Sequence, residues 1–123
     1  MNFDWGKFLS VAEALSSTDV GADREACLRS AVSRSYYAAF GSARSHAREG
    51  RLKTRQSAAE HGEVSLVFAQ KYGDAGGEIA KILSRLRTNR NIADYDEECE
   101  NVESLSTESM AYTRRVLDLL ATL

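Results

Sequence analysis

The sequence predicts an all-α protein, an up-and-down bundle of four to five helices, and three observations support this prediction. The 123 residues contain no proline, the residue that most strongly breaks a helix. Apolar side chains recur at intervals of three and four residues over most of the chain, as they do on one face of an amphipathic helix. The glycines cluster at a few points between these segments, where short turns would join the helices.

Five segments carry this periodicity. The second is the longest and is followed by Gly50, a residue type that commonly ends a helix. Residues 73–77, Gly-Asp-Ala-Gly-Gly, are predicted to form the turn between the third and fourth helices. The expected helices span residues 2–16, 22–49, 57–72, 78–93 and 102–121.

The length fits one domain, residues 1–123, with a hydrophobic core that needs neither disulfides nor metals. The net charge of −2 gives no overall basic balance of the kind that indicates nucleic-acid binding. Locally, basic residues dominate residues 44–55 and acidic residues dominate residues 94–103. These stretches could be solvated faces, or they could steer a polyanion or pair with a protein partner.

The two cysteines, Cys27 and Cys99, form no zinc-binding pattern, and the chain opens without a secretory signal. No apolar run approaches the length of a membrane span. We therefore expect a reduced, cytoplasmic protein with no membrane association, no metal site and no cofactor.

The fourth expected helix ends with a charge on its apolar face. Ile79, Leu83 and Leu86 form an ordinary stripe, and the same spacing then reaches Arg90. An inward arginine needs a carboxylate, another acceptor or a water-filled cleft, and a cleft lined by arginines is suited to binding phosphate. Alternatively, Arg90 pairs with Asp94 one turn later on a frayed helix end.

Aromatic residues mark the second and third helices. Tyr36 and Phe40 fit the core, whereas Tyr37 points elsewhere and is the better candidate for a dimer contact or a site. His61 shares a face with Phe68, and a lone inward histidine is more often a core or capping group than a catalyst.

Three motifs resemble a known family. Residues 31–40, AVSRSYYAAF, resemble the A-x-x-R-x-Y-Y-A-x-F helix of the HEPN superfamily. His61 and Phe68 are similar to the H…F pair that opens the next helix in its bacterial members, and residues 86–96 are similar to its L…R…A-D-Y-D segment. The resemblance covers about residues 22–121.

The resemblance implies a bundle that dimerises, with a polar cleft at the dimer interface. Many HEPN proteins are metal-independent endoribonucleases, including toxins of toxin–antitoxin pairs whose antitoxin is an MNT-type nucleotidyltransferase. The implied RNA- or phosphate-binding residues are Arg34, Arg87 and Asn91. The implied catalytic residues are Arg90, Asp94, Tyr95 and His61.

The sequence departs from the family signature, in which an arginine is followed, after four to six residues, by a histidine. Tyr95 stands at that place relative to Arg90, and Asp94 stands there relative to Arg87. Metal-free RNA cleavage requires proton transfer, which histidine performs well near neutral pH and arginine does not. Loss of a proton-transfer group typically costs about 10²–10⁴ in rate, so we expect a slow or inactive nuclease unless the third helix brings His61 to the end of the fourth.

Three functions remain open on the sequence. The first is a HEPN endoribonuclease in a toxin–antitoxin or defence setting. The second is a non-catalytic HEPN module that binds a nucleotide or a nucleotidyltransferase partner, with Tyr95 as the nearest candidate for modification by that partner. The third is a dimeric scaffold in which Arg90 only ties helices together.

Overall fold

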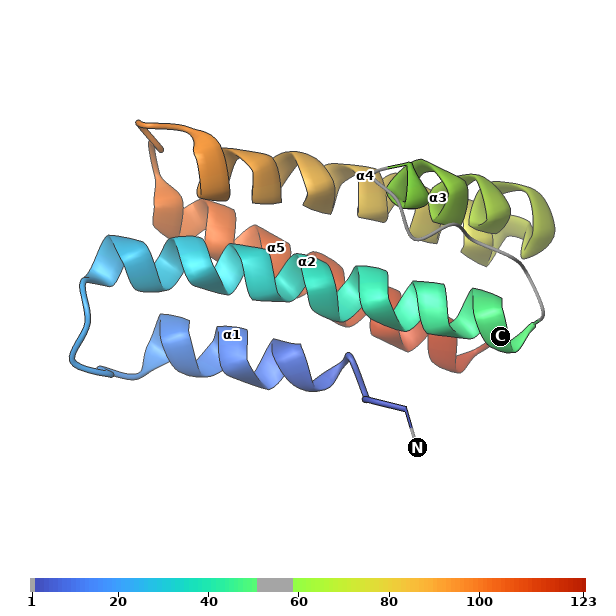
Figure 1. The fold of residues 1–123 in the computed structure, drawn as a ribbon, viewed down its shortest axis with the longest axis horizontal. Helices are drawn as coiled ribbons and strands as arrows, with labels where there is room; N and C mark the ends of the chain where they lie inside the picture. The colour runs from blue at the N-terminus through green and yellow to red at the C-terminus, as the bar shows by residue number, and fades with distance from the viewer. Residues whose placement is uncertain (1, 51–58) are drawn as a thin grey trace.

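A computed structural model describes residues 2–50 and 59–123, and all of the regular secondary structure in these residues is helical (Figure 1). The helices are α1 (Lys7–Ser17), α2 (Arg24–Glu49), α3 (Glu60–Lys71), α4 (Gly73–Tyr95) and α5 (Val102–Ala121). The prediction of an all-α bundle is confirmed. The basic connector expected at residues 51–57 lies outside the described residues.

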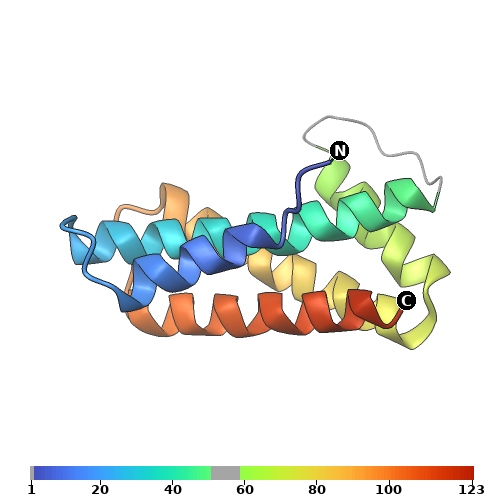
Figure 2. The same cartoon turned by 90° about the horizontal axis from the view of Figure 1, so that it is seen from below.

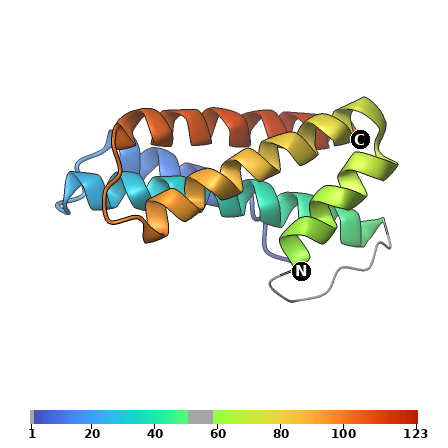
Figure 3. The ribbon, with the colours of Figure 1, turned by 90° about the horizontal axis from the view of Figure 1, so that it is seen from above.

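Four of the helices, α1, α2, α4 and α5, alternate in direction along the bundle, as Figure 1 shows. Helix α1 lies beside the first half of α2, and α5 runs along the back of the bundle over most of its length (Figure 2). Helix α3 crosses obliquely at one end of the bundle, where it packs against α4 (Figure 3).

Helix α2 is the centre of the bundle and contacts each of the other four helices. Tyr36 and Phe40 are buried, as predicted. The small side chains of Ala31, Ser35 and Ala38 are fully covered, which is consistent with close approach of the neighbouring helices. The main core cluster joins α2, α3, α4 and α5 through Tyr36, Ala39, Phe40, Ala43, Ala47, Val64, Phe68, Ile79, Ile82, Leu83, Leu86, Val116 and Leu119.

The turn predicted at residues 73–77 is wrong, because these residues form the first turn of α4. The chain reverses at Gly73 itself, whose φ of +63° favours glycine. A Cβ atom on Gly76 would overlap the carbonyl oxygen of Phe68 and would lie 2.6 Å from the Cβ of Tyr72. Glycine is therefore needed here for the close approach of α3 to α4, and not to end a helix.

The first helix begins at Lys7, five residues later than predicted. Before it, Oδ1 of Asp4 accepts a hydrogen bond from the backbone N–H of Gly6 (3.0 Å). The ring of Trp5 packs on Gly41 of α2, where an added Cβ atom would lie 2.7 Å from Cε3 of the ring. The apolar spacing of this segment thus reflects packing against α2 and extends beyond the helix.

The predicted start of the third helix, residue 57, lies outside the described residues, and the remaining helix ends lie close to their predicted positions. Helix α2 begins after Asp23, whose side chain accepts a hydrogen bond from the N–H of Ala26 (2.9 Å), and Gly50 follows its last residue. Within the described residues, no helix combines the length and apolarity that a membrane crossing requires.

Candidate functional site

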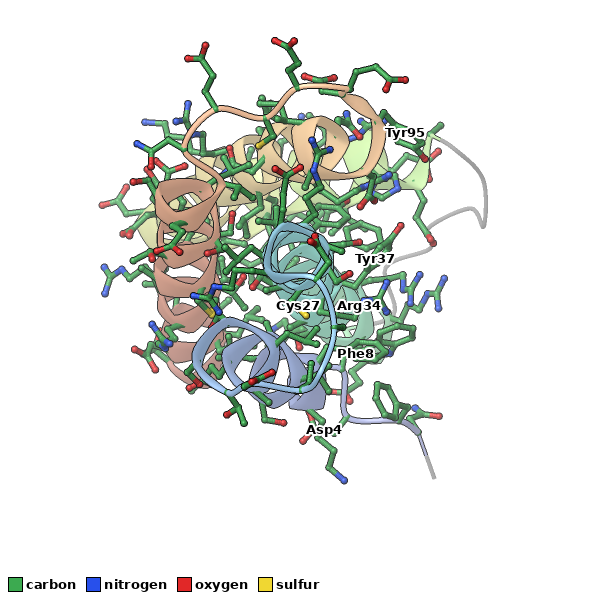
Figure 4. All side chains as sticks on the ribbon, turned by 90° about the vertical axis from the view of Figure 1, so that its left-hand side faces the viewer. Asp4, Phe8, Cys27, Arg34, Tyr37 and Tyr95 are labelled. Atoms are coloured by element: carbon green, nitrogen blue, oxygen red, sulfur yellow. The ribbon has the colours of Figure 1, made fainter. Side chains whose placement is uncertain are left out.

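The predicted site residues gather on the side of the bundle that faces away from α5. There the second half of α4 lies along α2, and the beginning of α3 lies further along α2 (Figure 3). Figure 4 shows Phe8, Arg34, Tyr37 and Tyr95 down this side, with α5 on the other. We call this surface the arginine–aromatic face.

Arg90 continues the buried stripe of α4, as its spacing predicts. Its side chain is only 11% exposed, and one of its terminal nitrogens lies 3.8 Å from Oδ2 of Asp94. The predicted pairing of Arg90 with Asp94 is therefore present. The Nε atom of Arg90 is buried and has no hydrogen-bond partner among the described residues. Both interpretations of this arginine hold in part, because it leans inward and also pairs within its own helix.

Three tyrosine rings surround the Arg90 guanidinium. Its Cζ atom lies 5.5 Å from the ring centre of Tyr36, 5.7 Å from that of Tyr37 and 5.9 Å from that of Tyr95. Burial disfavours the charge on Arg90, but its contacts with Tyr95, Tyr37 and Asp94 outweigh burial and raise its pKa. Arg90 therefore provides a fixed positive charge with restricted freedom to move.

His61 reaches the same place from the first turn of α3. Its Nδ1 atom pairs with the hydroxyl of Tyr36 on α2. Its ring stacks on Tyr36, at 5.4 Å between centres, and on Phe40, at 4.4 Å. His61 also lines one cavity together with Arg87 of α4.

The surroundings of His61 favour its neutral form. Burial lowers its pKa, and the charges of Arg87 and Arg90 lower it further. Burial also raises the pKa of Tyr36 far above its ordinary value, so the Tyr36 hydroxyl stays protonated. Since Nδ1 is engaged with Tyr36, Nε2 is the ring nitrogen left for a ligand.

A small cavity of about 80 Å³ opens between α3 and α4 beside His61. Its polar lining includes the side chains of Ser65, Ser84 and Arg87 together with Tyr36. Arg87 is exposed, unlike Arg90 one turn further on. The cavity is large enough to admit a phosphate-sized group.

The end of α4 carries the remaining predicted residues. Oδ2 of Asp94 accepts a hydrogen bond from the hydroxyl of Ser33 (3.3 Å), which ties α4 to α2. Tyr95 is 73% exposed. Asn91 is exposed, and within the described part of the chain no hydrogen bond joins it to the other site residues.

Arg34 lies one step further along the arginine–aromatic face. Its Cζ atom is 4.9 Å from the ring centre of Phe8 and 5.1 Å from that of Tyr37. Because Arg90 also contacts Tyr37, that ring links the two arginines. The structure therefore brings together Arg34, Arg87, Arg90, His61, Asp94 and Tyr95, and leaves Asn91 at the margin.

Sequence reasoning missed Glu60, which precedes His61. Its side chain is 6% exposed and accepts hydrogen bonds from Arg44 (3.3 Å) and Arg48 (2.8 Å) of α2. A glutamate in the first turn of a helix is ordinarily a solvated residue that favours the helix dipole, so the pattern gave no signal of burial.

Arg29 was missed as well. Its guanidinium donates hydrogen bonds to the carbonyl oxygens of Ala93 (3.1 Å), Asp96 (2.7 Å) and Glu97 (3.3 Å). These bonds hold the last turn of α4 and the start of the acidic stretch against α2. The spacing of Arg29 within α2 carries no sign of this contact.

Chemically, the site combines a fixed positive charge, an exposed arginine, a neutral imidazole and a carboxylate. Such a set can bind a phosphate diester and move a proton beside it. A metal ion would need at least three histidine, cysteine, aspartate or glutamate side chains close together. Residues 2–50 and 59–123 contain no such group. No protein-family model, curated protein or solved structure matches the chain.

Proposed function

We propose that the chain is a HEPN-like domain that acts on RNA as a metal-independent endoribonuclease in a toxin–antitoxin or defence setting. His61 would take the role of the histidine that is absent after Arg90. The observation that carries this proposal is the convergence of His61, Tyr36 and Arg87 around one phosphate-sized cavity.

In this proposal, Nδ1–H of neutral His61 donates to the hydroxyl oxygen of Tyr36, and the unprotonated Nε2 takes the proton of an RNA 2′-hydroxyl. The 2′-oxygen then attacks the neighbouring phosphorus, and the bond from phosphorus to the 5′-oxygen breaks. Arg87 holds the phosphate, and Arg90 adds charge that favours the transition state. Tyr95 is the candidate donor of a proton to the leaving 5′-oxygen, and the products are a 2′,3′-cyclic phosphate and a 5′-hydroxyl.

Cleavage of end-labelled RNA in the presence of a chelator tests this proposal. His61→Ala should lower the cleavage rate by about 10²–10⁴, the usual effect of losing a proton-transfer group. His46→Ala is the matched control, because the His46 ring packs against Phe68 and Tyr72 and does not line the cavity. Equal cleavage by the wild type and His61→Ala would refute the role of His61.

A non-catalytic module that partners an MNT-type nucleotidyltransferase is the second candidate. The observation that favours it is the exposed Tyr95 hydroxyl at the end of α4, followed directly by the acidic stretch. A gene for a small nucleotidyltransferase next to this one would provide the enzyme to test. Transfer of label from nucleotide to the wild type but not to Tyr95→Phe, together with no RNA cleavage, would favour this function.

We also propose that two copies of the chain associate through the arginine–aromatic face. Phe3 and Tyr95 are both large, apolar and at least half exposed, and Phe3 packs on Phe8 of this face at 5.2 Å between ring centres. Sedimentation of the wild type as a dimer and of Tyr37→Glu as a monomer is the expected result. A monomeric wild type would contradict it.

A further inference from the structure

Glu60 is the most deeply buried carboxylate close to the candidate site. Its side chain accepts hydrogen bonds from two arginines of α2, and it is the first residue of α3. A buried carboxylate is tolerated only when it is well paired, so these arginines determine where the first turn of α3 lies.

Arg44, which pairs with Glu60, also contacts the aromatic rings around His61. The Cζ atom of Arg44 lies 4.8 Å from the ring centre of Trp5 and 5.3 Å from that of Phe40. Phe40 is also the ring on which His61 stacks. Arg44 is therefore held between two rings, which gives Glu60 a fixed partner.

The start of α3 has no side-chain cap of its own. Ala59, the N-cap residue, has no side-chain atom that could accept a hydrogen bond from the first turn. The contacts that join this turn to α2 include the Glu60 pairs and the contact of His61 with Tyr36 and Phe40.

We propose that Glu60 is a positioning residue that pins the first turn of α3 to Arg44 and Arg48 and so holds His61 on Tyr36, facing Arg87. Glu60 does not line the cavity and is not assigned a contact with RNA. The importance of this role for cleavage depends on the proposed function, but the position of His61 can be measured without RNA.

The charges around His61 make it possible to distinguish two effects of Glu60 on the pKa of His61, the effect of its negative charge and the effect of its holding His61 in place. Tyr36 and Arg44 face it from α2, Glu60 precedes it on α3, and Arg87 and Arg90 face it from α4. The negative charge of Glu60 raises the pKa of His61 against the larger lowering effects of burial and of the α4 arginines. Removing only this charge should lower the pKa of His61, whereas releasing His61 into solvent should raise it toward about 6.5.

The experiment is a pH titration of the histidine ring signals by NMR on the full chain, which contains only two histidines. Glu60→Ala removes the carboxylate. Glu60→Asp keeps the negative charge but shortens the side chain. It therefore changes the position of the first turn of α3 without removing the charge. Glu78→Asp is the matched control, because Glu78 pairs with Arg115 through two hydrogen bonds (2.6 and 3.0 Å) between α4 and α5, away from the cavity.

We expect the pKa of His61 to rise in Glu60→Ala and, by less, in Glu60→Asp, with loss of the ring contact between His61 and Tyr36. The signal of His46 should stay at its wild-type position, which shows that the rest of the bundle is folded. If the His46 signal also moves to that of an unfolded chain in Glu60→Ala, Glu60→Asp decides the question. An unchanged or lowered pKa of His61 in the deciding variant would overturn the proposal, because Glu60 would then act through its charge or not at all.

Cleavage provides the second readout. If the proposed nuclease function holds, Glu60→Ala should lower kcat by up to about 100-fold with little change in KM, because misplacement of a catalytic group affects the chemical step more than binding. If the pKa of His61 rises in the Glu60 variants but the wild type cleaves no RNA, the positioning role stands and only the nuclease function is refuted.

Discussion

The hydroxyl of Tyr36 on α2 pairs with Nδ1 of His61 on α3, and the two rings stack at 5.4 Å. Replacement of Tyr36 by Phe keeps the ring and removes this pair. We expect a loss of about 0.5–1.5 kcal/mol in the free energy of unfolding, the usual contribution of one hydrogen bond, measured by urea denaturation. RNA cleavage should fall as well, because the His61 ring would no longer be fixed with Nε2 free. A variant as stable and as active as the wild type would show that the pair is not used.

The two arginines of α4 should behave differently when each is changed to Ala. Arg87 is exposed and lines the cavity, so Arg87→Ala should weaken RNA binding and reduce the slope of log K against log salt by about one, with little effect on stability. Arg90 is largely buried among three tyrosine rings, so Arg90→Ala should also lower the free energy of unfolding by about 1–2 kcal/mol. Filter binding at several salt concentrations and urea denaturation measure the two effects. Equal stability losses in both variants would contradict the distinction.

Stability should fall as the pH drops from about 7.5 to 5.5, and His61 should account for part of the fall. Burial and the nearby arginines lower the pKa of His61 in the folded protein. Above the unfolded-state pKa of about 6.5, the ring is neutral in both the folded and the unfolded state and does not change the free energy of unfolding. Below that value the unfolded chain binds a proton before the folded protein does, so the free energy of unfolding decreases. His61→Gln should show a smaller decrease in urea denaturation over this range, and an identical decrease would exclude His61 as the cause.

Two adjacent glycines of α4 should respond to alanine with opposite signs. A Cβ atom on Gly76 would overlap the Phe68 carbonyl oxygen, whereas one on Gly77 would meet nothing within 4 Å. Gly76→Ala should destabilise the protein by about 1–3 kcal/mol through overpacking. Gly77→Ala should stabilise it by about 0.5–1 kcal/mol, because alanine is the better helix former. Thermal unfolding of the pair measures both effects, and stabilisation by both would mean that α3 can move away from α4 freely.

The fold class could be predicted from sequence because an amphipathic helix records its buried face in its own residue spacing. The glycine-rich segment at residues 73–77 misled that reasoning. Glycine ends helices, but it also permits two helix backbones to touch, and only the packing of α3 against α4 distinguishes these uses. The start of α1 was predicted too early for a similar reason. Trp5 packs against α2 as a residue of a helix would, although the chain before Lys7 is not helical.

The site could be predicted only in part. The inward lean of Arg90 and its pairing with Asp94 follow from positions within one helix. The contact between His61 and Tyr36 does not, because spacing within α3 says nothing about which face of α2 it meets. Asn89 shows the same limit. It lies on the buried stripe and donates hydrogen bonds to Glu108 (2.8 Å) and Ser109 (3.1 Å) of α5, partners that the sequence of α4 does not reveal.

The attachment of the acidic stretch to Arg29 has a consequence for its evolution. The oxygens that accept from this guanidinium belong to the main chain, and any residue at positions 93, 96 or 97 would supply the same oxygens. The acidic side chains of Asp96 and Glu97 can therefore change in sequence, or be selected for contact with a partner, while the path of the loop stays the same. Arg29 itself has no such freedom, because the single ammonium group of a lysine does not reproduce its broad planar fork.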